Sequence, residues 1–248
     1  MSAIYPDLRE RTVVVTGGGS GIGASIVEHF ADQAAKVGFL DIADEPSQAL
    51  AARFENVAYE RADLTDIEAL RAAITRIRER FGPVTVLVNN AAHDQRHAWD
   101  EVTPEYWDAR MNVNLRHQFF AAQAVVDDMK AAGGGAIVNM GSTSWMIGEG
   151  GMVAYTAAKS AVLGLTRSLA RDLGPFGIRV NSIAPGWIMT ERQRELWVTP
   201  EKLEVQMQRQ CIKRELVPAD IARMVLFLCS ENAGACTNQD FVVDGGLL

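Results

Sequence analysis

The sequence predicts an α/β fold: a single Rossmann-type, doubly wound parallel sheet of about seven strands with helices on both faces. Short apolar runs rich in β-branched residues alternate with longer helical patterns. Most of these runs are nearly continuous, as expected of parallel strands that helices cover on both faces. Strands that alternate with helices imply right-handed βαβ units. The predicted strands are Thr12–Val15, Lys36–Leu40, Val57–Tyr59, Val84–Val88, Ala136–Met140, Ile178–Ile183 and Phe241–Val243.

Start signals place helices between these runs. Thr65 followed by Glu68 fits a capping box for a helix that runs towards Arg80. Thr103–Pro104 and Thr199–Pro200 each fit an N-cap residue followed by proline at the first helical position.

Composition and charge limit the classes of partner. The chain has 248 residues and a net charge of −7, which argues against a nucleic-acid or anionic-membrane partner. No signal peptide, membrane-length apolar run, linker or repeat is evident, so residues 1–248 are expected to form a single cytoplasmic domain. The cysteines form no Cys-x-x-Cys pair and have no histidine cluster beside them, which predicts a reduced compartment and no metal site. They are Cys211, Cys229 and Cys236.

A glycine-rich turn joins the first strand to the first helical pattern. It runs from Thr16 to Gly23 and leads directly into Ala24–Ala34. Gly17 permits the tight turn, Gly21 lets the backbone approach a pyrophosphate, and Gly23 lets helix and strand pack closely. The helix N-terminus then offers free N–H groups to phosphates, so the segment predicts a dinucleotide site.

Asp41 ends the second strand, at the distance where a carboxylate can bind the adenosine ribose hydroxyls. A carboxylate there repels a 2′-phosphate. No arginine or lysine is expected nearby to hold such a phosphate, and Ser20 and Ile42 are neutral. These residues favour NAD over NADP.

Tyr155 and Lys159 are four residues apart in the helical pattern Val153–Leu173, which places both side chains on one helical face. A phenol has a pKa of about 10 and is a poor base at neutral pH. A neighbouring ammonium is expected to stabilise the phenolate and lower that pKa. The tyrosine could then exchange a proton with a substrate oxygen.

With these motifs in this order, the chain resembles the short-chain dehydrogenase/reductase family over essentially its whole length. The spacing within Thr16–Gly23 is typical of that family. So are Asn89–Ala92 after the fourth strand, Pro185–Gly186 followed by Thr190, and Val243–Gly246 at the C-terminus.

The resemblance implies how a nicotinamide cofactor is held. It places Asp63 at the adenine, the Pro185–Gly186 loop at the nicotinamide carboxamide and Lys159 at the nicotinamide ribose. The cofactor-binding residues expected for NAD are Gly17, Ser20, Gly21, Ile22, Gly23, Asp41, Ile42, Asp63, Leu64, Asn90, Ala91, Tyr155, Lys159, Pro185, Gly186, Ile188 and Thr190.

The resemblance also implies a catalytic set of four residues: Asn114, Ser142, Tyr155 and Lys159. Ser142 lies thirteen residues before the tyrosine and would polarise the reacting oxygen. Asn114 would mark a helix kink that holds a water, which continues a proton relay from the lysine. Ser144 and Asn112 are alternatives to Ser142 and Asn114.

Substrate specificity is expected in the loops beyond the strand ends: His93–Trp99, Thr143–Met152 and Trp187–Thr199. Their hydrogen-bonding groups lie beside tryptophans, which suits a polyhydroxylated ring better than an acyl chain. The tryptophans could instead serve packing or subunit contacts. The expected substrate residues are His93, Ser144, Trp145, Glu149, Trp187 and Arg192.

A narrower resemblance points to bacterial NAD-dependent aldose 1-dehydrogenases of the D-xylose, L-arabinose or D-galactose type. Its segments are Arg96–His97, Tyr106–Asp108, Asn112–His117, Gly141–Trp145, Arg192–Gln193 and Trp197–Glu201. It implies oxidation of an aldose at C1 to the aldonolactone. Trp187 departs from the xylose type, where a smaller polar residue is common.

Other functions on the same fold stay open at this point. They are a polyol or secondary-alcohol dehydrogenase, a carbonyl or 3-oxoacyl reductase, and a non-catalytic NAD-sensing scaffold. The family resemblance further implies a homotetramer.

Overall fold

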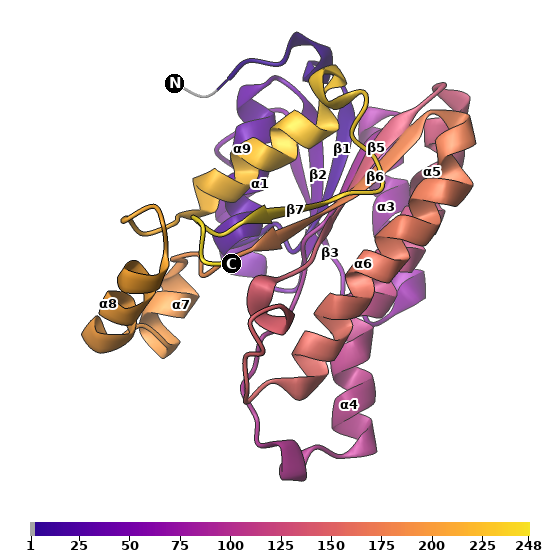
Figure 1. Ribbon diagram of the computed structural model, residues 1–248. Coiled ribbons are helices and arrows are strands. Elements are labelled where there is room, and N and C mark those ends of the chain that lie inside the picture. The colour runs from indigo at the N-terminus through magenta and orange to yellow at the C-terminus, as the bar shows by residue number, and fades with distance from the viewer. Residues whose placement is uncertain (1–2) are drawn as a thin grey trace.

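The computed structural model describes residues 3–248, and its centre is a parallel sheet of seven strands in the order β3–β2–β1–β4–β5–β6–β7 (Figure 1). The predicted doubly wound sheet is confirmed, and each predicted apolar run is one of its strands. The strands are β1 (Thr12–Thr16), β2 (Lys36–Asp41), β3 (Val57–Arg61), β4 (Val84–Asn89), β5 (Gly135–Met140), β6 (Ile178–Pro185) and β7 (Asp240–Val243).

Helices cover both faces of the sheet. One face packs against α1 (Gly21–Asp32), α2 (Asp44–Ala51) and α9 (Pro218–Cys229). The other packs against α3 (Ile67–Phe81), α5 (His117–Ala131) and α6 (Val153–Leu173). The remaining helices are α4 (Pro104–Met111), α7 (Glu191–Leu196) and α8 (Pro200–Arg209). These three extend beyond the carboxyl ends of the strands (Figure 1).

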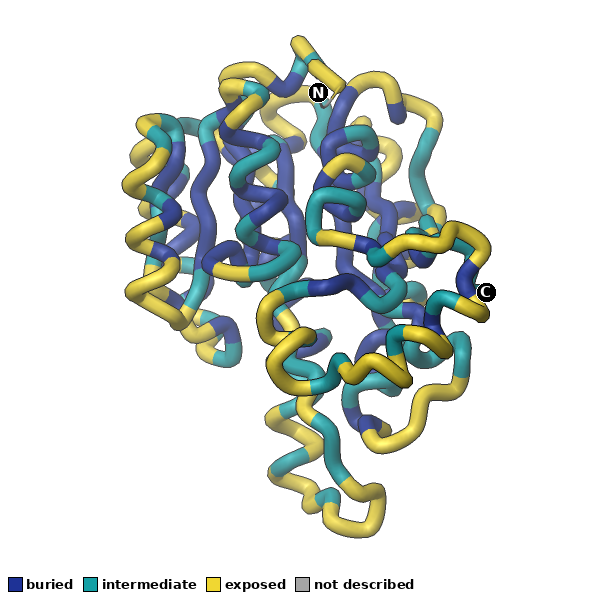
Figure 2. The backbone as a smooth tube through the Cα atoms, turned by 90° about the vertical axis from the view of Figure 1, so that its left-hand side faces the viewer, coloured by how far each residue is buried: buried dark blue, intermediate teal, exposed yellow. Residues whose placement is uncertain are grey.

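Burial on both faces explains the continuous apolar strands. Val13 and Val15 of β1 belong to the core under α1 and α9, whereas Val14 belongs to the core under α3 and α5. All five residues of β1 are buried. In Figure 2 the buried centre of the sheet is dark blue, whereas the segments beyond the strand ends are largely exposed and drawn in yellow.

Several predicted helix boundaries are confirmed. Thr103 accepts a hydrogen bond from the Tyr106 N–H, and Thr199 accepts one from the Lys202 N–H. In both helices proline follows at the first position. The segment Trp187–Thr199, by contrast, is not entirely a loop, because it contains α7.

The predicted cap of α3 is wrong. Asp66, not Thr65, is the N-cap residue, and its Oδ1 accepts hydrogen bonds from the N–H groups of Glu68 at 3.0 Å and Ala69 at 3.1 Å. Thr65 instead donates its hydroxyl to Asp63 Oδ1 at 2.7 Å. A carboxylate that accepts two N–H groups caps the helix better than a hydroxyl already committed elsewhere.

Replacing Asp66 by Ala is expected to lower the free energy of unfolding by about 1 kcal/mol, because two N–H groups of the first turn lose their acceptor. Thr65→Val is the matched control and should cost less. Denaturant unfolding of both variants measures the difference. An equal or larger loss of unfolding free energy for Thr65→Val would show that Asp66 is not the main cap of the helix.

Two further properties follow from the described chain. Between residues 3 and 248, no helix is long and apolar enough to cross a membrane. The cysteines are free thiols that differ in environment: Cys211 is exposed, Cys229 is buried and Cys236 is half-buried.

Candidate active site

A cleft of about 1780 Å³ opens at the carboxyl ends of the strands. It begins between β1 and β4, where the strand order reverses, which is the usual place for a ligand in an open α/β sheet. Its lining includes nearly every residue that the sequence predicted for cofactor, catalysis and substrate. The exceptions are Asn114 and Trp145.

The glycine turn has the shape that a pyrophosphate needs. Gly17 has φ +66°, and a Cβ there would lie 2.8 Å from the Cα of Ala91. A Cβ on Gly23 would lie 1.8 Å from the Gly17 carbonyl oxygen, so only glycine permits this contact of helix and strand. At Gly21, φ is +55° and only the Thr190 side chain comes near. The backbone at Gly21 is therefore open to the cleft beside the start of α1, where an anion is favoured.

Asp41 lies at the same end of the cleft and fixes the backbone around it. Its Oδ2 accepts a hydrogen bond from the Gly19 N–H at 2.8 Å. Its Oδ1 accepts from the N–H groups of Ile42 at 2.8 Å and Ala43 at 3.0 Å. Only a carboxylate offers acceptors on both sides, so the glycine turn and the end of β2 are fixed together by one charged group at the cleft wall.

The expectation that no basic side chain lies near Asp41 is wrong in three dimensions. Arg61 of β3 is the register partner of Asp41. Its guanidinium donates to the Ile42 carbonyl at 2.9 Å and pairs with Asp44 at 2.7 Å. Parallel pairing of β2 with β3 brings this arginine beside Ile42, next to the cleft wall, and the Asp44 carboxylate holds it there.

Thr16 is a supporting residue that sequence reasoning missed. Its buried Oγ1 accepts hydrogen bonds from the N–H groups of Asn90 at 3.0 Å and Ala91 at 3.1 Å. Asn90 returns the contact by donating Nδ2 to the carbonyls of Thr16 at 3.0 Å and Gly17 at 2.9 Å. These bonds fix the ends of β1 and β4 beside the glycine turn.

Ser142, Tyr155 and Lys159 all line the middle of the cleft. Helix α6 presents Tyr155 and Lys159 from one face, and the Lys159 Nζ lies 5.7 Å from the centre of the Tyr155 ring. Lys159 is buried and donates to the Met140 carbonyl at the end of β5 at 2.7 Å. Ser142 donates to Ser144 Oγ at 2.9 Å, so the two alternative serines are hydrogen-bonded neighbours.

The expected lowering of the tyrosine pKa is wrong for the chain without its cofactor. Burial raises the pKa of Tyr155 to about 12, although its hydrogen bond with Ser142 acts in the opposite direction. Burial also lowers the pKa of Lys159 to about 7, while the Asp94 carboxylate raises it. Loss of hydration disfavours the charged form of each group, which raises the pKa of the phenol and lowers the pKa of the ammonium. Of the two serines, Ser142 is the one that acts on the pKa of Tyr155, and it lowers that pKa.

Asn114 lies behind the cleft wall, on the π-helical turn Asn112–Arg116 that links α4 to α5. It is fully buried, whereas Asn112 is half-buried. Its Oδ1 accepts from the His93 N–H at 2.8 Å and its Nδ2 donates to the His93 carbonyl at 3.3 Å. The predicted helix irregularity is therefore present, and the asparagine at its centre fixes the backbone of the first substrate loop.

His117 is a buried group that the sequence did not single out. Its Nε2 is 3.1 Å from the carbonyl oxygen of Ala91. Burial, together with the charge of Lys159, lowers the pKa of His117 to about 3. The imidazole is therefore neutral at physiological pH and donates Nε2–H to Ala91, next to the glycine turn.

The substrate loops meet at the outer end of the cleft. Arg96 pairs with Glu149 at 2.9 Å, and its guanidinium lies 5.3 Å from the centre of the Trp197 ring. Within residues 3–248, Arg96 Nε and Trp197 Nε1 are buried donors without a partner. Trp145 is not part of this end: it sits in the short turn Thr143–Trp145 and does not line the cleft.

Asp94 joins two of these loops, which sequence spacing could not reveal. It accepts hydrogen bonds from Arg192 and Gln193, 98 and 99 residues away. His93 contacts Arg110 of α4 through Nδ1, and burial lowers its pKa, with the charges of Arg110 and Arg192 adding to the effect. His93 is thus held at the cleft by Arg110, with a pKa below that of an ordinary imidazole.

Comparison with known proteins agrees with this geometry. The family model described as enoyl-(acyl carrier protein) reductase matches residues 17–248. The chain belongs to the short-chain dehydrogenase/reductase family. A crystal structure of a candidate short-chain alcohol dehydrogenase from Sinorhizobium meliloti 1021 superposes with a TM-score of 0.92 at 33% identity and covers 97% of both chains.

Two similar relatives carry sugar-dehydrogenase names. A protein of Rhizobium meliloti described as a "probable galactose dehydrogenase" is 50% identical and covers 99% of this chain and 98% of its own. A D-xylose 1-dehydrogenase of Caulobacter vibrioides is 49% identical, with the same coverage. This chain is therefore an oxidoreductase of the family, and members of this kind use a nicotinamide cofactor.

Proposed function

We propose that this protein oxidises an aldose at C1 to the aldonolactone with NAD as hydride acceptor. The observation that carries the proposal is the position of Ser142, Tyr155 and Lys159. They lie between a nucleotide-shaped end of the cleft and an end rich in hydrogen-bonding groups beside tryptophans. The unpartnered donors of Arg96 and Trp197 suit the hydroxyls of a sugar. The galactose and xylose dehydrogenases among the relatives support the same substrate class.

The nucleotide end fits the cofactor that the family implies. The open backbone at Gly21 and the start of α1 would hold the pyrophosphate, Asp41 the adenosine ribose, and Thr190 with Pro185–Gly186 the nicotinamide. Asp63 and Leu64 line the cleft where the adenine would lie. When bound, NAD supplies the hydride acceptor and a positive charge near the catalytic residues.

The chain's own groups then manage the proton. Ser142 holds the C1 hydroxyl of the hemiacetal, and Tyr155 as phenolate removes its proton. The ammonium of Lys159 stabilises that phenolate and binds the ribose. Asn114 keeps the π-helical turn and the His93 backbone in place behind them. Loss of the hydroxyl proton makes C1 ready to release its hydride, and the lactone that results opens in water.

Cofactor choice and assembly complete the proposal. The Asp41 carboxylate disfavours a 2′-phosphate, and Asp44 keeps Arg61 from binding one, so NAD is preferred. We propose a homotetramer located in the cytoplasm. The exposed Phe119 of α5 and Val153 of α6, and Val242 of β7, are apolar groups that subunit contacts could cover.

An assay of NADH formation at 340 nm tests the proposal. The panel contains pentoses, hexoses, polyols and secondary alcohols, each with NAD and with NADP. Turnover of one or a few aldoses with NAD is the expected result, because the substrate end offers polar partners to a ring. Turnover of polyols or alcohols alone would favour the second candidate, a polyol or secondary-alcohol dehydrogenase, while binding of NAD without any turnover would favour a scaffold.

A further inference from the structure

Trp187 is anchored to helix α7 by a series of hydrogen bonds. Its indole Nε1–H donates to Gln193 Oε1 at 2.9 Å. Gln193 Nε2 donates in turn to Asp94 Oδ2 at 2.7 Å. Asp94 Oδ1 accepts from Arg192 Nη2 at 3.2 Å and Nε at 3.3 Å. Three segments are joined: the end of β6, helix α7 and the loop after β4.

In this series of hydrogen bonds, the chemical groups at its two ends decide which atom donates and which accepts. An indole N–H can only donate, and a carboxylate can only accept. Gln193 between them must therefore turn its oxygen to Trp187 and its nitrogen to Asp94. A glutamine satisfied on both sides has one orientation, and so does the tryptophan bound to it.

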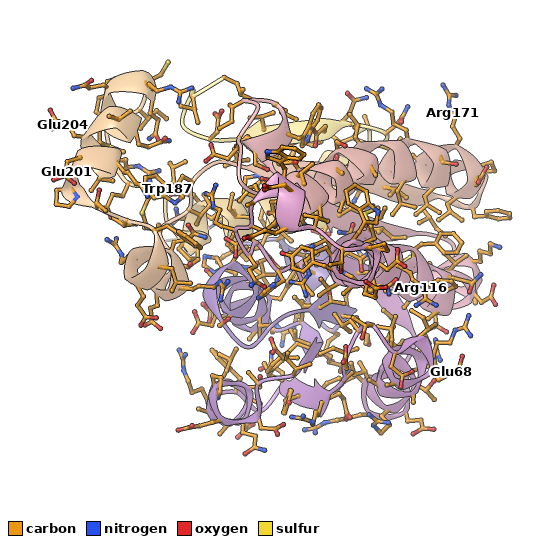
Figure 3. All side chains as sticks on the ribbon, turned by 90° about the horizontal axis from the view of Figure 1, so that it is seen from below. Glu68, Arg116, Arg171, Trp187, Glu201 and Glu204 are labelled. Atoms are coloured by element: carbon orange, nitrogen blue, oxygen red, sulfur yellow. The ribbon has the colours of Figure 1, made fainter. Side chains whose placement is uncertain are left out.

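The anchored tryptophan is part of the cleft wall. Trp187 is half-buried, lines the cleft, and follows directly on Pro185–Gly186. The N–H edge of its indole is turned to Gln193, which lines the same cleft. Figure 3 looks onto this end of the molecule and shows Trp187 beside helices α7 and α8.

From this geometry we infer that Trp187 is the wall on which the apolar face of an aldose ring packs, and that Gln193 and Asp94 are positioning residues that hold this wall. The inference rests on the proposed function and deepens it. A pyranose has a face of C–H groups and a rim of hydroxyls, which match a cleft lined by an indole and by the polar side chains of Arg96 and Arg192. An open-chain polyol has no such rigid face and gains less from a fixed wall.

A swap of donor and acceptor tests the positioning chain. Gln193→Glu keeps an acceptor for the indole N–H but places two carboxylates together at Asp94. The double variant Asp94→Asn with Gln193→Glu restores a donor at position 94 and an acceptor at position 193. The measured quantity is the dissociation constant of the aldose, by calorimetry, for the complex of each variant with NADH, so no turnover is needed.

Gln193→Glu is expected to weaken aldose binding about tenfold, and the double variant is expected to recover most of that loss. NADH affinity should stay unchanged in both. Arg194→Ala is the matched control, because it breaks the Arg194–Glu215 ion pair on the same helix without touching Trp187. An equal loss in the double variant, or an equal loss in the control, would overturn the positioning role.

Substitution of the wall itself gives a second, independent readout. Trp187→Phe keeps an aromatic face without the N–H, and Trp187→Ala removes the face. Aldose affinity should fall in the order wild type, Phe, Ala, while the melting temperature of each NADH complex reports folding. Wild-type binding in all variants would overturn the inference alone. Failure of the wild-type NADH complex to bind any aldose would overturn the proposed function as well.

Discussion

Replacing Tyr155 by Phe is expected to lower kcat for aldose oxidation about 10³-fold, the usual contribution of a positioned proton-transfer group. The substitution removes only the phenolic oxygen. The glycine turn, Asp41 and the Asn90–Thr16 contacts do not involve it, so NADH should bind nearly as before. Initial rates at 340 nm and calorimetric titration with NADH measure the two quantities. Activity close to wild type would remove Tyr155 from the proposed mechanism.

The pH dependence gives the same residue a second test. Burial raises the pKa of Tyr155 to about 12 in the free chain, so its phenol is protonated at neutral pH. Bound NAD and a charged Lys159 should both lower that pKa. Because the phenolate is the reactive form, kcat for oxidation should rise with pH. A difference titration at 295 nm between wild type and Tyr155→Phe should show the phenol ionising at lower pH once NAD is present. No shift on NAD addition would contradict this account.

Ser142→Ala is the natural companion variant. Ser142 is the group whose hydrogen bond lowers the Tyr155 pKa, and it also accepts from the Ser144 N–H at 3.1 Å. Its loss should lower kcat and move the rise of kcat to higher pH. Ser144→Ala should do neither to the same degree, because Ser142, and not Ser144, lowers the pKa of Tyr155.

The architecture could be predicted because its signals are local. A strand buried on both faces needs a continuous apolar run, and Thr12–Thr16 satisfies that need wherever its neighbours lie. The same holds for the glycine turn, where φ of Gly17 and Gly21 and the contact at Gly23 demand glycine whatever the ligand. Tyr155 and Lys159 could be paired because the helix period alone places them on one face.

The rest depends on contacts between distant segments or on competition between neighbours. Asp94 meets Gln193 across 99 residues, and Arg61 meets Asp41 only through parallel strand pairing. Trp145 shares its loop with Ser144, yet only the serine reaches the cleft. The pKa values of Tyr155 and Lys159 also escaped prediction, since the spacing of two residues says nothing about how deeply both are buried.

Replacing Asp41 by Asn is expected to improve the use of NADP clearly only when Arg61 is also released from its ion pair with Asp44. Asp41→Asn alone removes the charge and one acceptor, so kcat/KM with NAD should fall about 10- to 100-fold, as for loss of a hydrogen bond to a charged group. It leaves Arg61 paired with Asp44 at 2.7 Å, so NADP should gain little. Adding Asp44→Asn frees the guanidinium of Arg61, which can then bind a 2′-phosphate through two parallel hydrogen bonds.

The double variant should therefore use NADP at least about tenfold better than Asp41→Asn does, by kcat/KM. A third substitution, Arg61→Ala, separates the possible causes. If the gain comes from Arg61, it disappears in the triple variant. If the gain persists, removal of negative charge alone explains it. Unchanged use of NAD in Asp41→Asn would mean that the carboxylate serves the Gly19, Ile42 and Ala43 amides and not the ribose. Binding these amides and binding the ribose are separable roles, because Asp41 accepts the three amide hydrogen bonds in the chain without cofactor.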